Sequence, residues 1–226
     1  MTLRDLLLLG HIAVFGVWLG TDIATFILSR RVLDRGIDLP SRRSLAGAMT
    51  SIEVIARLCL PTMLALGVAL SVNMGGIDMP RWVIGWVFVP TVLWLWLIWT
   101  VHRSAGDSEL SSRLGYADLA VRTVVCVALW VVSLVSLIGG TGPIFADYLS
   151  FKVLLFAVIM TSGIAIRLEL RPFAAAFTDL MAQGSSDERE SRLGSTLRRA
   201  QPLVGVIWFC LIGASLLAVM KAVPWQ

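Results

Sequence analysis

The stretch LGHIAVFGVWLGTDIATFILSRR, residues 9–31, decides the fold. It is almost wholly apolar, and a helix needs about 20 such residues to cross the hydrocarbon core of a membrane. Its interior nevertheless holds two ionisable side chains, His11 and Asp22. The stretch therefore predicts a membrane-spanning helix that carries polar groups at depth.

The same apolar pattern recurs along the chain. Of the 226 residues, 57% are hydrophobic and only 15% are charged, whereas a soluble domain has about 25% charged residues. Blocks of this length are too long for barrel strands. We expect an all-α polytopic bundle in a lipid bilayer, with residues 1–226 as a single transmembrane domain. Its six predicted spans cover about residues 5–29, 52–73, 83–101, 119–139, 148–168 and 203–222.

The arginines indicate the orientation of these spans. They gather in three alternate connecting segments: Arg30, Arg31, Arg35, Arg42 and Arg43; Arg103, Arg113 and Arg122; Arg167, Arg171, Arg189, Arg192, Arg198 and Arg199. Because basic residues stay on the cytoplasmic side, both termini are predicted to lie outside, with residues 174–201 as a cytoplasmic loop. The basic segments are interpreted as topology signals, and no nucleic-acid partner is expected.

Three cysteines, Cys59, Cys126 and Cys210, fall inside predicted spans. They are far apart in the sequence, and no C-x-x-C pair occurs. We therefore interpret them as small apolar side chains rather than as metal ligands or a disulfide framework.

Four residues of the first span share one face. His11, Phe15, Trp18 and Asp22 are spaced by 4, 3 and 4, which aligns them along one stripe of an α-helix. A charged group in lipid costs several kcal/mol unless it faces the bundle interior and finds a partner. The stripe is therefore predicted to face inward.

Asp22 needs a partner at its own depth. The second span runs antiparallel to the first and offers Arg57, with Glu53 one turn away. We predict a structural ion pair between Asp22 and Arg57, joined by Glu53. The sequence leaves two roles open for it, a connection between the first two helices and a relay for a proton or ligand.

His11 lies toward the opposite side of the membrane from Asp22, where Lys152 begins the fifth span. One interpretation is that this lysine extends its amine to the membrane surface. The other is that His11 and Lys152 line one cavity, since ionisable residues within a membrane mark functional sites by default.

Three motifs together resemble one family. They are H-x6-W-x-G from His11, IARLCLPTMLALG with Arg57, and YLSFKVLLFAVIM around Lys152. Their order is similar to that in the CopD/HemJ-like superfamily, which contains copper-resistance protein D and the HemJ-type protoporphyrinogen oxidase. The resemblance covers the first, second and fifth spans.

The resemblance implies a bacterial inner-membrane protein that binds haem b or a porphyrin in a redox role. His11 and Lys152 would take the catalytic and cofactor-binding positions, and Trp18 would pack on the ring. If the chain is an enzyme, the resemblance implies an oxidoreductase of the protoporphyrinogen oxidase type.

Two other functions remain open from the sequence. A copper transport or resistance protein would use His11 with Met74 and Met79 of the loop VNMGGIDMPRW, because imidazole and thioether groups suit Cu(I). A non-catalytic membrane subunit or scaffold would use its polar residues to join helices, and a homo-oligomer or a membrane partner would then be expected.

Overall fold

A computed structural model describes residues 1–104, 108–139, 144 and 147–222. The described part folds into six long helices and one short helix. These are α1 (Leu3–Val32), α2 (Leu39–Asn73), α3 (Val83–Arg103), α4 (Ser108–Gly139), α5 (Asp147–Glu169), α6 (Phe173–Gln183) and α7 (Asp187–Ala222). Six of them are long and apolar enough to cross a membrane, which confirms the predicted all-α membrane bundle.

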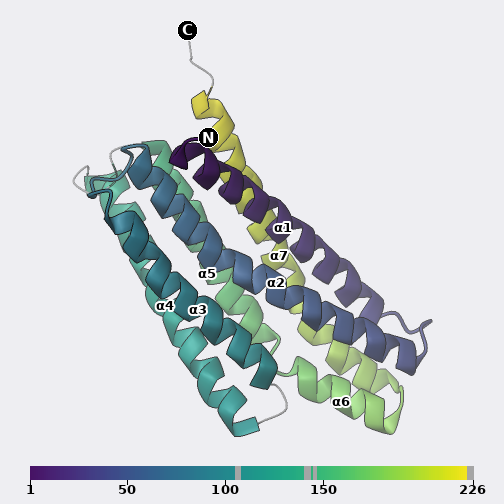
Figure 1. Ribbon diagram of the computed structural model, residues 1–226. Helices are drawn as coiled ribbons and strands as arrows, with labels where there is room; N and C mark the ends of the chain where they lie inside the picture. Colours follow the sequence, from purple (N-terminus) through teal and green to yellow (C-terminus); the bar gives the residue numbers. More distant parts are fainter. Residues whose placement is uncertain (105–107, 140–143, 145–146, 223–226) are drawn as a thin grey trace.

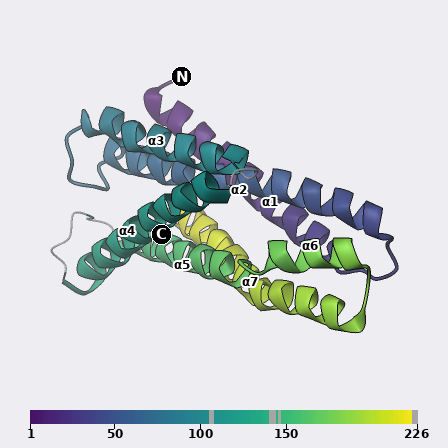
Figure 2. The same cartoon turned by 90° about the horizontal axis from the view of Figure 1, so that it is seen from below.

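The six long helices form two layers. Figure 2 shows α1, α2 and α3 in one layer and α4, α5 and α7 in the other, with α6 at one end. Each long helix packs against the next one in this order, and α7 returns to α1. The return contact includes an edge-to-face pair of Phe26 and Trp208, with ring centroids 5.2 Å apart. The layers therefore enclose one common core.

The bundle has two different ends. The first turn of α1 and the last described turn of α7 lie at one end, which we call the terminal end (Figure 1). The opposite end, which we call the α6 end, holds α6, the connection between α1 and α2, the last turn of α3 and the first turn of α4. The three arginine-rich segments of the sequence gather toward this α6 end.

Three helices, α2, α4 and α7, begin well before their predicted spans. Helix α2 starts at Leu39 because Asp38 caps it, accepting a hydrogen bond from the Ser41 backbone N–H at 2.8 Å, and because Pro40 suits a first turn. Helix α7 starts at Asp187, with acidic residues in its first turn. Residues 174–201, expected as a loop, thus form most of α6, a short connection and the first turns of α7.

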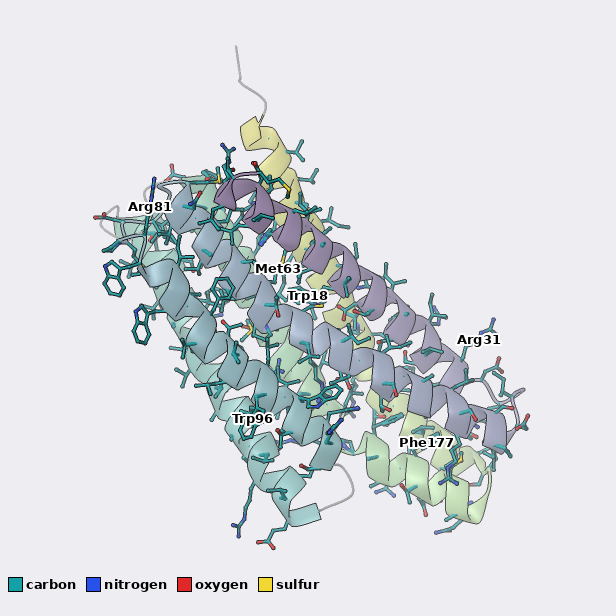
Figure 3. The ribbon with its side chains drawn as sticks, in the orientation of Figure 1. Trp18, Arg31, Met63, Arg81, Trp96 and Phe177 are labelled. Atoms are coloured by element: carbon teal, nitrogen blue, oxygen red, sulfur yellow. The ribbon has the colours of Figure 1, made fainter. Side chains whose placement is uncertain are left out.

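The extended helix ends pack together at the α6 end. Leu180 of α6 and Leu193 of α7 are completely buried in a small apolar cluster. Phe177 lies beside this cluster and is labelled in Figure 3. Burial of this apolar face stabilises helices that the polar sequence of the segment alone would not predict.

The core and the outer surface differ as the bilayer requires. Trp18 and Met63 lie in the centre of the bundle, where Figure 3 labels them. Trp96 and other large apolar side chains cover the outside. Such a surface would be unfavourable in water but suits acyl chains. Exposed examples are Trp82, Trp86, Trp96, Val124 and Phe209.

Candidate functional site

The polar stripe of α1 faces the other helices. Trp18 is 3% exposed, and His11, Phe15 and Asp22 are partly buried. The opposite side of α1 carries exposed aliphatic side chains: Ile12, Val17, Ile23 and Ile27. The helix therefore turns His11 and Asp22, the two ionisable residues of its central part, toward protein, as the spacing of the stripe predicts.

His11 packs against α2 toward the terminal end. A methyl group added at Gly67 would lie 3.4 Å from Cε1 of the imidazole, so the ring rests closely on the glycine. The Nδ1 atom of His11 is buried and has no hydrogen-bond partner among the described residues. Buried ring nitrogens are normally hydrogen-bonded, so this unpartnered nitrogen makes the region around His11 a candidate ligand site.

Lys152 of α5 contributes a positive charge to the same region. It is partly buried, and its charge acts on the imidazole of His11. The structure thus brings His11, Gly67 and Lys152 together from α1, α2 and α5. Chemically, this arrangement places one imidazole nitrogen within the field of one lysine charge.

Trp18 lies apart from these polar groups along α1. Seven residues separate it from His11, which corresponds to about 10 Å of helix. Its ring packs edge-to-face on Phe156 at a centroid distance of 6.0 Å. Trp18 therefore belongs to the hydrophobic core in this structure, while His11 and Lys152 supply the polar part of the candidate site.

The two methionines predicted for copper lie in the connection from α2 to α3. Met74 is the residue that ends α2, and Met79 follows a turn at Gly75 and Gly76. Both side chains are exposed, at 46% and 43%. In the described part of the chain, no group of three or more His, Cys, Asp or Glu residues is arranged to hold a metal ion.

The predicted ion pair between Asp22 and Arg57 is replaced in the structure by a pair between Arg57 and Glu53. Arg57 binds Glu53 of its own helix, with a distance of 2.6 Å between Nη2 and Oε1. Asp22 makes no ion pair in the described structure, and it faces Glu53 instead. Glu53 and Arg57 are four residues apart on α2, so their side chains lie on the same helix face and can pair.

A second polar cluster, not predicted from the sequence, joins α3, α4 and α5. Asp118 is 1% exposed and accepts hydrogen bonds from Arg122, Arg167 and the indole N–H of Trp94. The Arg122 Nε lies 3.0 Å from one carboxylate oxygen and 3.1 Å from the other. The guanidinium of Arg122 also lies over the Trp94 ring, 5.7 Å from its centroid.

The sequence does contain a signal for this cluster. Asp118 and Arg122 are four residues apart, the spacing of an ion pair on one helix face. In the predicted topology, Arg122 and Arg167 belong to the basic segments at the ends of the spans 119–139 and 148–168. In the structure both are helical and reach Asp118, since Arg122 lies one turn after it on α4 and Arg167 lies in the last turn of α5.

These features define a polytopic helical membrane protein with two separate polar sites among its helices. One site surrounds His11 and Lys152, and the other surrounds Asp118 and Arg122. Comparisons with known protein families, with curated proteins and with solved structures found no match. The residues of these two sites and the three sequence motifs therefore provide the only indications of function.

Proposed function

We propose that this chain is a membrane protein that binds haem or a porphyrin in a redox role, with His11 and Lys152 as the ligand-binding residues. The observation that carries the proposal is the buried Nδ1 atom of His11, which has no hydrogen-bond partner among the described residues. The positive charge of Lys152 acts on the same imidazole ring. The motif resemblance adds support from the sequence.

The residues of the His11 site fit such a group. Imidazole is a common axial ligand of haem iron, and the ammonium group of lysine suits a propionate carboxylate. His102 ends α3 at the α6 end, so it does not serve as a second axial ligand beside His11. When bound, haem would supply one-electron chemistry. The chain would hold it through one imidazole and one cation.

The arginine distribution supports a location for this site. We infer that the α6 end lies in the cytoplasm and the terminal end on the outer side of a bacterial inner membrane, because basic residues gather at the α6 end. His11 would then lie in the outer half of the bilayer. A reporter enzyme that works only outside the cytoplasm, fused after residue 226, should be active. An inactive fusion that is stably expressed would contradict this orientation.

The test of ligand binding uses the full chain purified in detergent. After addition of haem, the wild-type protein should develop a Soret absorption band with about one haem per chain. His11→Ala should abolish the band, and Lys152→Ala should weaken haem binding by about tenfold. His102→Ala is the matched control, because it removes the other histidine of the chain and should leave the band unchanged.

Two outcomes would contradict the proposal. One is the absence of a Soret band in the haem-supplemented wild type. The other is an unchanged spectrum in a His11→Ala variant whose unfolding temperature equals that of the wild type.

Metal analysis of the same samples addresses the alternative of copper. Copper that is retained by the wild type and lost in a Met74→Ala, Met79→Ala variant would favour the copper function instead.

A further inference from the structure

The buried guanidinium of Arg122 has donors that the protein does not use fully. Arg122 is 8% exposed. Its Nε donates to Asp118, whereas its Nη2 is buried with no hydrogen-bond partner in the described structure. Leaving a buried charged donor unsatisfied costs more free energy than leaving a neutral donor unsatisfied. The fold therefore presents an N–H group that suits an external acceptor.

Two other arginines lie near Arg122. The charges of Arg57 from α2 and Arg167 from α5 both act on Arg122. Within the cluster, Asp118 pairs with Arg122 and Arg167, and Glu53 pairs with Arg57. Arg122 and Arg167 thus share the single carboxylate of Asp118. Asp22, whose carboxyl lies near Glu53, forms no ion pair with any of the three arginines in the described structure. Positive charge is expensive at this depth unless an anion accompanies it.

We propose that Arg57, Arg122 and Arg167 bind a phosphate group. Guanidinium groups bind phosphate oxygens through planar, paired N–H donors. Three guanidinium groups from three different helices suit a group with three acceptor oxygens better than they suit a carboxylate, which has two. Arg57 and Arg122 already have carboxylate partners within the chain, Glu53 and Asp118.

The partial exposure of two of the three arginines provides an entry route for phosphate. Arg122 is deeply buried, whereas the side chains of Arg57 and Arg167 are 32% and 23% exposed. Arg167 also lies in the last turn of α5, at the α6 end of the bundle. A phosphate can therefore arrive either on a lipid headgroup or as a free ion. In both cases Arg57 and Arg167 would meet it before Arg122.

This phosphate site does not depend on the proposed haem site. His11 packs on Gly67 toward the terminal end, whereas Arg167 lies in the last turn of α5 at the α6 end. Haem binding and phosphate binding should therefore be lost in different variants. Failure of one proposal would leave the other standing.

The experiment measures phosphate binding by thermal unfolding of the full chain in dodecyl maltoside, a detergent without phosphate. Tryptophan fluorescence reports unfolding, because the chain has nine tryptophans. One arm adds inorganic phosphate, and a second adds dihexanoyl phosphatidic acid below its micelle concentration. Sodium acetate at equal ionic strength is the anion control. A ligand that binds only the folded protein raises its unfolding temperature.

Arg57→Gln is the main variant, because Arg57 is partly exposed and its ion pair lies within one helix. It should weaken phosphate binding by about tenfold or more. Glu53→Gln is the matched control, since it breaks the same ion pair but keeps all three arginines, and it should bind phosphate at least as well as the wild type. Arg113→Gln breaks a comparable pair with Glu109 outside the cluster and should leave binding unchanged.

The two arms distinguish the sources. A rise with inorganic phosphate indicates a free ion, and a rise with phosphatidic acid alone indicates a lipid headgroup. The proposal is overturned if neither ligand raises the unfolding temperature, if acetate acts equally well, or if Arg57→Gln responds like the wild type. It is also overturned if Glu53→Gln and Arg57→Gln lose binding equally, because broken helix packing would then explain both.

Discussion

Arg42 and Glu190 form an ion pair that is almost completely enclosed, with 1% and 3% of their side chains exposed. The guanidinium donates to both carboxylate oxygens, at 2.6 and 2.9 Å. Its Nε donates to the backbone oxygen of Val32 at 2.7 Å. This one side chain therefore joins the end of α1, the start of α2 and the start of α7 at the α6 end.

The first prediction concerns removal of one member of this pair. Arg42→Met should lower the free energy of unfolding by about 3–5 kcal/mol, because it leaves the Glu190 carboxylate buried without its cation. Unfolding by sodium dodecyl sulfate in mixed micelles measures this change. Arg43→Met is the control, since Arg43 is the exposed neighbour and should have little effect. Similar losses in the two variants would contradict the assignment.

The double variant Arg42→Met, Glu190→Leu provides a second test of the same pair. Replacing both charges with apolar groups of similar volume removes the unpaired charge, so much of the lost stability should return. The coupling free energy from the full cycle should exceed about 1 kcal/mol. Additive effects would show that the two side chains do not act together.

The second prediction is a pH dependence of stability. Hydrogen bonds from Arg42, followed by that from Ser185, hold the pKa of the Glu190 carboxyl below its usual value. A carboxyl with a lowered pKa in the folded state stabilises the fold above its unfolded pKa, and this stabilisation disappears as the pH falls through the folded pKa. The stability difference between the wild type and the Arg42→Met, Glu190→Leu variant should therefore shift against the wild type between about pH 6 and pH 3. A difference that does not change over this range would contradict the prediction.

The membrane spans were predictable because length and hydropathy are local properties. Helix α3 was expected at residues 83–101 and extends over Val83–Arg103. The early starts of α2 and α7 depend on packing between distant segments. Leu180 of α6 and Leu193 of α7 become buried in one cluster only when α6 packs against α7. Arg42 and Glu190, which form an ion pair, are 148 positions apart in the sequence. No local pattern carries that information.

The polar sites were predictable in part for the same reason. The spacing of His11, Trp18 and Asp22 sets their common face, since it depends only on helix geometry. The partner of Asp22 depends on the rotation of α2 about its axis, which the sequence does not show. In the structure Arg57 pairs with Glu53 and not with Asp22. The burial of Asp118 likewise depends on Arg167 arriving from α5.

The third prediction tests the close approach of α1 and α2 at Gly67. Gly67→Ala should fold normally, because its methyl group would meet Cε1 of His11 at an ordinary contact distance of 3.4 Å and because alanine favours helix by about 1 kcal/mol over glycine. Gly67→Leu should displace the imidazole and cost about 1–3 kcal/mol. Gly16→Leu is the control, since nothing lies within 4 Å of a side chain there. Equal sodium dodecyl sulfate unfolding curves for the two leucine variants would contradict the proposed packing.

The fourth prediction concerns the three cysteines, which are free and buried: Cys59, Cys126 and Cys210. A charged maleimide should not label the folded protein and should label all three thiols after denaturation in sodium dodecyl sulfate. Cys126 is held from two sides, because its sulfur lies 3.3 Å from the Thr161 hydroxyl and 3.8 Å from the backbone oxygen of Ala157. Val124→Cys, at a 69% exposed position of the same helix, is the control for access to the reagent. If it reacts with a neutral maleimide in micelles while the native thiols do not, burial explains the protection.

The fifth prediction concerns the bond between Trp94 and Asp118. The indole N–H donates to the carboxylate at 3.0 Å, and both residues are buried. Trp94→Phe removes this donor and part of the ring over which Arg122 lies, so it should cost about 1–3 kcal/mol of stability. Trp96→Phe is the matched control, because Trp96 is 64% exposed on the neighbouring face of α3. Unfolding monitored by helical circular dichroism compares both variants with the wild type. If Trp94→Phe is no less stable than Trp96→Phe, Asp118 does not depend on the indole, and Arg122 and Arg167 alone suffice to hold its charge.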